Sequence, residues 1–225
     1  MFKKPSALVV VAHPDDEAIF FGGLILSKKY DWHVICVTDG NADDMGDFRI
    51  GQFKKSCKAL GAKKAECWGF PDIFEHRLDV HALIEKLLTL KKFNKVFTHG
   101  ILGEYGHAHH QDVSYATHKV FSKNTSVYSV AYNIQPEIKL TLTADLYKKK
   151  QKILWDIYKD EIKRFVNVIP ATWSEGFTEV SLKEVEALYN WLTENKSFEP
   201  KSLHHYKWLA PYLQGGGGHL KLRPF

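Results

Sequence analysis

The change from an apolar run to a cluster of charged side chains near the amino terminus constrains this chain more than any other feature. Residues 7–11 are Ala-Leu-Val-Val-Val, and residues 12–17 are Ala-His-Pro-Asp-Asp-Glu. A run rich in β-branched residues predicts a strand buried on both faces, as in a parallel sheet covered by helices. Pro14 cannot continue the hydrogen-bonded ladder, so the charged residues fall at the carboxyl end of the strand, where a helix begins.

This charged turn has two interpretations. Asp15 or Asp16 could cap the following helix, with His13 as an ordinary loop residue. A cap needs one carboxylate, however, whereas here a histidine and two consecutive aspartates crowd into four residues. Because these carboxylates repel one another unless a cation is present, the pattern favours a divalent-metal site.

The first half of the chain alternates between strand and helix patterns. We expect strands at 7–11, 32–37, 65–70 and 95–98, and helices at 17–29, 48–60, 78–90 and up to about residue 121. This alternation predicts a three-layer Rossmann-like α/β fold, with a mostly parallel sheet and helices on both faces. The active site is then expected at the carboxyl ends of the strands, where His13, Asp39, Asp72 and His99 all fall. The pair Gly22-Gly23 would let the first helix pack closely on the sheet, but it is not the G-x-G-x-x-G of a dinucleotide site.

The second half carries weaker patterns. Residues 126–132 and 139–143 are expected to be strands, 144–164 a long helix, and 181–193 a helix with a Ser181/Glu184 capping box. The lysines of the long helix are expected to face solvent largely: Lys148, Lys149, Lys150, Lys152, Lys159 and Lys163. The aromatic and glycine-rich tail, 204–225, is interpreted as a packing extension or a lid, within a single domain spanning residues 1–225.

Composition narrows the function classes. Lys and Arg exceed Asp and Glu by 31 to 26, for a net charge of +5. This charge would suit an anionic substrate, but without a basic and aromatic groove it does not indicate nucleic-acid binding. The three cysteines are not in C-x-x-C spacing and are expected to be core thiols in a reducing compartment. Since no segment resembles a membrane span or a signal peptide, we expect a cytoplasmic protein, and the sequence leaves room for a homo-oligomer.

A second cluster, Tyr105-Gly106-His107-Ala108-His109-His110, follows the strand expected at 95–98. Imidazole is a common metal ligand, and two histidines with one carboxylate leave coordination positions open for water and substrate. His13, Asp16 and one of these three histidines are therefore expected to bind a metal. Zinc is favoured, although Fe²⁺ or another divalent metal would accept the same ligand types.

Together the two motifs resemble the LmbE/PIG-L-like zinc-dependent de-N-acetylases, whose pattern pairs A-H-P-D-D-E with Y-G-H-x-D/N-H. The resemblance covers about residues 6–120 and includes Thr38-Asp39-Gly40, Arg49, Leu60-Gly61 and Phe70-Pro71-Asp72. The rest of the chain matches loosely, chiefly at 175–177.

The resemblance implies a role for each motif residue. It implies His13, Asp16 and His110 as zinc ligands, Asp15 as the general base, and His107 and Tyr105 near the substrate carbonyl. We expect Arg49, Asp39 and Glu104 to contact the substrate. The implied function is a metal-dependent hydrolase that uses metal-activated water to remove the N-acetyl group from an N-acetylated amino sugar or glycoconjugate.

Two departures from the family pattern leave alternatives open. His109 stands where the family usually has Asp or Asn, and an imidazole there would not support a protonated His107. Gln52 replaces a Glu three residues after Arg49, so Arg49 would be held less rigidly. One alternative is an amidase acting on a non-sugar N-acyl conjugate, because the same chemistry hydrolyses other amides. The other is a catalytically degenerate sugar-binding protein.

Overall fold

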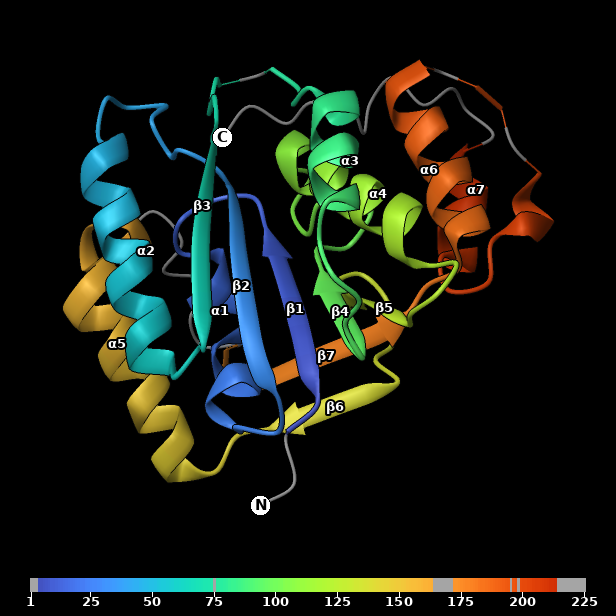
Figure 1. Ribbon diagram of the computed structural model, residues 1–225. Coiled ribbons are helices and arrows are strands. Elements are labelled where there is room, and N and C mark those ends of the chain that lie inside the picture. The colour runs from blue at the N-terminus through green and yellow to red at the C-terminus, as the bar shows by residue number, and fades with distance from the viewer. Residues whose placement is uncertain (1–3, 75, 164–171, 195, 198, 214–225) are drawn as a thin grey trace.

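The computed structural model describes residues 4–74, 76–163, 172–194, 196–197 and 199–213, and a seven-stranded sheet runs through it (Figure 1). The strand order is β3-β2-β1-β4-β5-β7-β6. The strands are β1 (Ser6–Val11), β2 (Asp31–Thr38), β3 (Lys64–Phe70), β4 (Lys95–Thr98), β5 (Val127–Val130), β6 (Ile138–Thr141) and β7 (Ser174–Glu179). The first five strands in that order are parallel, and β7 pairs antiparallel with both β5 and β6.

Helices cover both faces of this sheet (Figure 1). On one face lie α1 (Asp16–Leu26), α2 (Gly46–Leu60) and α5 (Ala144–Ile162), and on the other lie α3 (Val80–Leu88) and α4 (Ala108–Phe121). α6 (Leu182–Glu194) packs beside α4, together with short helical turns at Pro200–Ser202, Lys207–Leu209 and α7 (Ala210–Leu213). The predicted three-layer α/β fold with a mostly parallel sheet is therefore confirmed.

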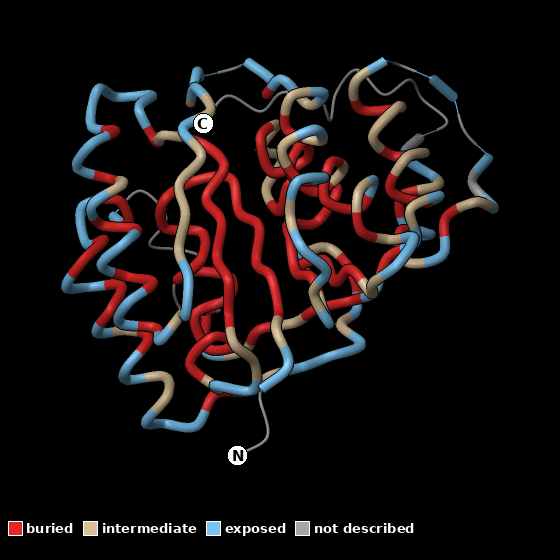
Figure 2. The backbone as a smooth tube through the Cα atoms, viewed as in Figure 1, coloured by how far each residue is buried: buried red, intermediate tan, exposed pale blue. Residues whose placement is uncertain are grey.

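The central strand β1 is buried on both of its faces, as its sequence predicts (Figure 2). Because successive side chains of a strand point to opposite faces, Ala7, Val9 and Val11 join the core beneath α1, α2 and α5. Leu8 and Val10 join the second core, beneath α3 and α4. This placement fixes the end of β1, and with it His13, in the middle of the molecule.

Most of the expected elements are present with shifted ends. α1 ends at Leu26 rather than near residue 29, and α2 begins at Gly46 rather than near residue 48. α2 ends at Leu60 as expected, and Gly61 after it has a φ of 88°, the left-handed conformation that glycine adopts at helix ends. Strand β7 was not predicted. Its sequence, Ser-Glu-Gly-Phe-Thr-Glu, has a single large apolar residue and no clear alternation, so only pairing with β5 and β6 reveals it.

Lys150 does not face solvent, contrary to what we expected of the lysines of α5. Its side chain is completely buried, and Nζ donates to Glu175 at 2.6 Å and to the carbonyl oxygens of Ile19 and Thr172 at 2.7 and 3.1 Å. The carboxylate of Glu175 also accepts from the backbone N–H groups of Gly23 and Leu24. A Lys–Glu ion pair thus joins α5 and β7 to the middle of α1.

The glycine pair of α1 makes room for this packing. A Cβ at position 22 would lie 3.3 Å from Cε of Lys150, and one at position 23 would lie 2.3 Å from Cδ2 of Leu142. The close approach is therefore to α5 and to the segment around β6 and β7, at the antiparallel edge of the sheet.

Glu184 anchors the segment that follows α6. Its backbone N–H donates to Ser181 Oγ, as a capping box requires, but its buried carboxylate accepts from the backbone N–H groups of residues 204–206 instead of closing the box. Tyr206 is buried in the cluster around α6, whereas Trp208 and Tyr212 are exposed. The glycine run of the expected tail lies outside the described residues.

Two further features are the cysteines and the length and apolar character of the helices. The three cysteines are free thiols, with Cys36 and Cys57 buried and Cys67 partly buried. Among the described residues, no helix combines the length and the apolar character that crossing a membrane requires.

Candidate functional site

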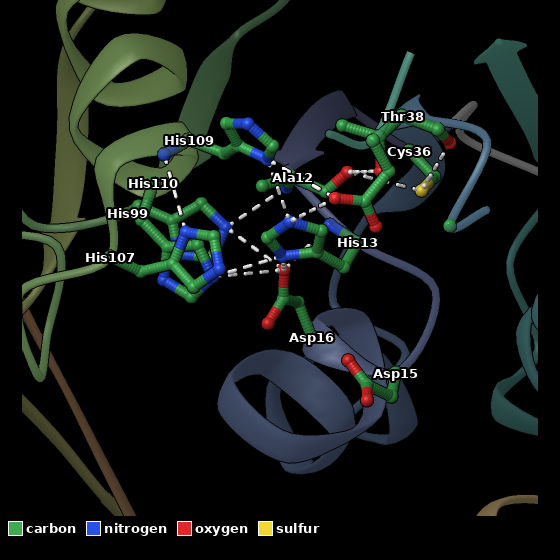
Figure 3. A network of polar contacts seen from close by, with 12 residues as sticks. Ala12, His13, Asp15, Asp16, Cys36, Thr38, His99, His107, His109 and His110 are labelled. Atoms are coloured by element: carbon green, nitrogen blue, oxygen red, sulfur yellow. Dashed lines mark hydrogen bonds and ion pairs between the residues drawn. The ribbon is translucent and has the colours of Figure 1, made fainter. Parts of the chain in front are cut away.

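The two sequence motifs meet at the point where the strand order reverses. β1 and β4 are neighbours in the sheet, and the chain winds away from them in opposite directions, which opens a crevice at their carboxyl ends. His13 follows β1, His99 follows β4, and His109 and His110 lie in the first turn of α4. Figure 3 shows these side chains converging with Asp16.

His13, Asp16 and His110 present three donor atoms to one another. His13 Nδ1 lies 3.2 Å from His110 Nε2 and 3.4 Å from Asp16 Oδ2, and His110 Nε2 lies 3.5 Å from Asp16 Oδ2. Tetrahedral ligands at zinc-ligand distances are about 3.3–3.4 Å apart. The donor types and their spacing therefore fit a divalent cation, and this set is one of three groups of metal-ligand type among the described residues.

Glu104 lies behind His110. Its Oε2 is 2.6 Å from His110 Nδ1 and 3.1 Å from His99 Nδ1, and its Oε1 accepts from the Gly100 N–H at 2.7 Å. A carboxylate that accepts from one ring nitrogen of a histidine leaves the other ring nitrogen free to face a cation. Such a carboxylate is a usual outer partner of a metal-binding histidine. Burial opposes the charge on Glu104, but the two histidines lower its pKa to about 2. The geometry thus supports Glu104 as the residue that orients His110, rather than as the substrate contact that we expected.

Asp16 is held at the start of α1. Its Oδ2 accepts from the His13 N–H at 2.7 Å and lies 3.3 Å from His99 Nε2. Burial alone would raise the pKa of Asp16, but His110, His99 and His13 hold it well below its usual range. The carboxyl group of Asp16 is therefore ionised.

Asp15 lies beside the cluster (Figure 3). Its φ is 127°, a conformation that L-residues rarely adopt, and its backbone N–H donates to Glu17 Oε2 at 3.1 Å. Glu17 in turn accepts from Ser56 and Tyr158, so α2 and α5 support this turn. Burial, together with the charges of Asp16 and Glu17, raises the pKa of Asp15 well above its usual value. Such strain and burial are common at functional sites.

Arg49 is held by a residue that the sequence did not indicate. Its Nη2 donates to Glu161 of α5, and its Nη1 donates to the carbonyl oxygen of Gly40 at 3.2 Å. The expectation of a loosely held Arg49 is therefore wrong, because Glu161 supplies the carboxylate that position 52 lacks. Gln52 instead donates to the carbonyl of Ile157, which also ties α2 to α5.

His107 and Tyr105 stand over the cluster from the loop that precedes α4. The centroid of the His107 ring lies 4.5 Å from that of His13, and the centroid of Tyr105 lies 5.4 Å from that of His110. His107 caps α4, and its Nδ1 accepts from the His109 N–H at 3.2 Å. Burial and the neighbouring histidines hold the pKa of His107 far below its usual range. His107 is therefore neutral, as its pairing with His109 led us to expect.

Asp39, Asp72 and His109 form the side of the crevice nearest β2 and β3. Asp39 Oδ1 accepts from the N–H groups of Asn41 and Asp72, at 2.9 and 3.1 Å, so it shapes two loops. Asp72 Oδ1 lies 3.5 Å from His109 Nδ1 and 3.7 Å from His13 Nε2. Of the four polar residues expected at strand ends, His13, His99 and Asp72 thus contact the cluster. Asp39 instead fixes the loops next to the cluster through its hydrogen bonds.

Sequence reasoning missed the supporting roles of Glu17 and Glu161. Glu17 belongs to the first motif, and its position inside an apolar helical pattern could have indicated a buried, partnered carboxylate. Glu161 lies among the charged residues of α5, where no sequence signal separates it from solvent-exposed neighbours.

The match to one known protein family spans both sequence motifs. The family described as "PIG-L: GlcNAc-PI de-N-acetylase" matches residues 8–121. An uncharacterized protein of Acanthamoeba polyphaga mimivirus is 29% identical over 69% of this chain and 76% of its own length. The N-acetylglucosaminyl-phosphatidylinositol de-N-acetylase of Saccharomyces cerevisiae is 24% identical over 80% of this chain and 68% of its own length.

A solved structure shares the fold. The N,N'-diacetylchitobiose deacetylase of Pyrococcus horikoshii superposes with a TM-score of 0.65 at 17% identity, covering 79% of this chain and 84% of the other.

Proposed function

The chain belongs to the PIG-L family of GlcNAc-PI de-N-acetylases, and from this premise we propose that it removes the acetyl group from the nitrogen of an N-acetylated amino sugar or glycoconjugate. The observation that carries the proposal is the convergence of His13, Asp16 and His110 beside the buried carboxylate of Asp15. Metal-assisted amide hydrolysis uses a Lewis acid, a base and an oxyanion donor, and the crevice offers residues for each function.

The first of these groups is the metal site. His13, Asp16 and His110 would hold a divalent cation, and two imidazoles with one carboxylate favour zinc. When bound, the cation supplies Lewis-acid polarisation of the amide carbonyl and lowers the pKa of a water molecule. Glu104 and the Asp16 contact to the His13 N–H keep the donor atoms aimed at one point.

Asp15 is the proposed general base. It takes a proton from the attacking water as the water oxygen bonds to the amide carbon. The raised pKa of Asp15 suits this role, because it makes the carboxylate a stronger proton acceptor than an exposed aspartate. The same proton then passes to the leaving nitrogen as the carbon–nitrogen bond breaks, so that acetate and a free amine are released.

His107 and Tyr105 are the proposed donors to the oxyanion. Because His107 is neutral and its Nδ1 accepts a backbone N–H, its own proton lies on Nε2 and can be donated. Burial and the carboxylates Asp16, Asp15 and Glu104 raise the pKa of Tyr105 well above its usual value, so its hydroxyl also keeps its proton. Arg49, fixed by Glu161, stands beside Asp15 as the proposed substrate contact.

The sugar assignment is tested with a panel of amides. Metal-stripped and zinc-loaded protein are incubated with N-acetylglucosaminyl-phosphatidylinositol, N,N'-diacetylchitobiose, N-acetylglucosamine and a peptide that carries N-acetyl-lysine. Freed primary amine and acetate are then measured. We expect equal amounts of amine and acetate from one or more sugars, and only with metal. Release from the peptide alone would favour the non-sugar amidase, and sugar binding without any release would favour the degenerate binding protein.

A further inference from the structure

The two ring nitrogens of His13 face two different sets of donor atoms (Figure 3). Nδ1 faces Asp16 and His110, the ligand set described above. Nε2 lies on the other side of the ring, 3.1 Å from His109 Nδ1 and 3.7 Å from Asp72 Oδ1. One imidazole therefore stands between two clusters of metal-ligand type.

The second cluster has the dimensions of the first. His13 Nε2, His109 Nδ1 and Asp72 Oδ1 are separated by 3.1, 3.5 and 3.7 Å, compared with 3.2, 3.4 and 3.5 Å in the first set. Both triangles lie close to the separation of about 3.3–3.4 Å between ligands of tetrahedral zinc. Ligand atoms of His13, His107 and His109 also lie within 4.8 Å of one another. Because Nδ1 of His107 accepts the His109 N–H, we do not count His107 among the ligands.

The donor types of these groups suit a cation. His109 is 2% exposed, and its imidazole supplies a nitrogen donor. The side chain of Asp72 is 7% exposed and supplies an oxygen donor. Neutral imidazole and carboxylate are the ligand types that zinc takes in proteins.

Contacts outside the cluster hold both donors in place. The Asp72 N–H donates to Asp39 Oδ1 at 3.1 Å, which fixes the turn after β3. The backbone of His76 hydrogen-bonds the His109 ring. Second partners of this kind orient metal-binding side chains.

We propose that Asp72, His109 and Nε2 of His13 form a second divalent-cation site, of zinc type, next to the site formed by His13, Asp16 and His110. His13 bridges the two cations, and its remaining ring proton is released to solvent when the second cation binds. The proposal concerns metal binding and does not depend on the deacetylase activity. If His13 and His109 instead share only a hydrogen bond, the crevice holds a single cation.

The test is the number of cations bound per chain. Purified full-length protein is stripped of metal and dialysed against buffered zinc, and bound zinc is measured by mass spectrometry. Wild-type protein is expected to bind two zinc ions. Asp72→Asn and His109→Asn should each lose one and keep the other, and Asp16→Asn should also retain one. Titration with Co²⁺ gives a second readout, since the absorption of the wild type should rise in two steps and that of Asp72→Asn in one.

His204→Asn is the matched control, because His204 is an exposed histidine next to His205 and far from the crevice in sequence. It should leave two zinc ions bound. A wild type that saturates at one ion, or Asp72→Asn and His109→Asn variants that still bind two, would overturn the proposal. So would a second ion that disappears in His204→Asn. The ion retained by each crevice variant, together with its circular dichroism spectrum, shows that the variant has folded.

Discussion

At the scale of single residues, Asp15 combines two features that each raise the free energy of the folded state. Its φ is strained, and its carboxyl group is buried near two other carboxylates. Glu17 stabilises this turn by accepting from the Asp15 N–H. Glu17 is itself held by hydrogen bonds from α2 and α5. A loop aspartate without a role in binding or catalysis would not need this support.

Substituting Asp15 tests its proposed role as the base. Asp15→Asn keeps the shape of the side chain, and asparagine tolerates a positive φ, so the turn should persist. We expect the variant to bind metal like the wild type, while kcat on a sugar substrate falls by about 10²–10⁴-fold, the usual contribution of a general base. Metal content and steady-state kinetics measure the two effects separately. A kcat within a few fold of the wild type would show that another group takes the proton.

At the scale of elements, α1 depends on a buried ion pair that reaches it from elsewhere in the chain. Lys150 of α5 bonds to the carbonyl of Ile19, and Glu175 of β7 bonds to the N–H of Gly23, one turn further along. These two hydrogen bonds fix the position of α1, the helix that begins with Asp16. The ion pair thus connects the antiparallel edge of the sheet to a proposed metal ligand.

Breaking this pair should destabilise the fold strongly. Lys150→Met leaves the Glu175 carboxylate buried without its cation, and we expect a loss of about 3–5 kcal/mol in the free energy of unfolding. Lys149→Met, at an exposed position of the same helix, should change it by less than about 0.5 kcal/mol. Urea denaturation measures both. In a Lys150→Met/Glu175→Gln double variant the loss should be smaller than the sum of the single losses, and additive losses would argue against coupling.

His118 should make α4 sensitive to acid. It is fully buried, with Nδ1 donating to the carbonyl of Ser114, and burial lowers its pKa from 6.5 to about 4. Between these values the unfolded chain binds a proton that the native protein does not, so stability falls as pH falls, by up to about 3 kcal/mol. Above pH 6.5 this group contributes no pH dependence.

The contribution of His118 can be isolated by substitution. In His118→Gln, the loss of stability between pH 6.5 and 4 should be smaller than in the wild type, as measured by urea denaturation across that range. His81→Gln, at an exposed position, should follow the wild type. Parallel pH profiles for wild type and His118→Gln would mean that His118 is not kept neutral by the fold.

At the scale of the whole molecule, many exposed lysines of the described residues lie away from the crevice. Exposed lysines lie at the amino ends of β2, β3 and β4, at the opposite end of the strands: Lys28, Lys29, Lys63, Lys64, Lys91 and Lys92. The residues after the carboxyl ends instead include Asp43, Asp44 and Asp72 in loops and Asp47 in the first turn of α2, together with Asp15 and Asp16. Among the described residues, the position of these charges does not by itself indicate an anionic substrate, and composition alone could not show their position.

Metal binding should stabilise the entire fold, because the proposed ligands come from opposite ends of the first half of the chain. At a free zinc concentration one hundred times the Kd, binding adds about 2.7 kcal/mol. For a chain of this size we expect a rise in Tm of about 5–10 °C. Calorimetry with zinc and with a chelator measures the shift. Asp16→Asn should weaken the response, and a Tm indifferent to zinc would contradict the assignment of the ligands.

The sequence alone determined the local features of this protein. The apolar run before His13 predicts a strand buried on both faces, and the alternation of strands and helices predicts the parallel part of the sheet. These patterns report on short-range preferences and on burial, which depend on neighbouring residues. For the same reason, the strand-end positions of His13, His99 and Asp72 were predictable before any contact was known.

Only the tertiary structure decided which side chains meet. Glu161 reaches Arg49 across 112 residues, Glu175 reaches the middle of α1 from a strand that has no clear pattern, and Lys150 is buried among lysines that are exposed. Each of these contacts depends on how one element packs against another. The sequence does not show whether a charged residue is hydrated or pairs with a buried ion. The two faces of His13 likewise become distinct only when β1, β4 and the turn after β3 come together.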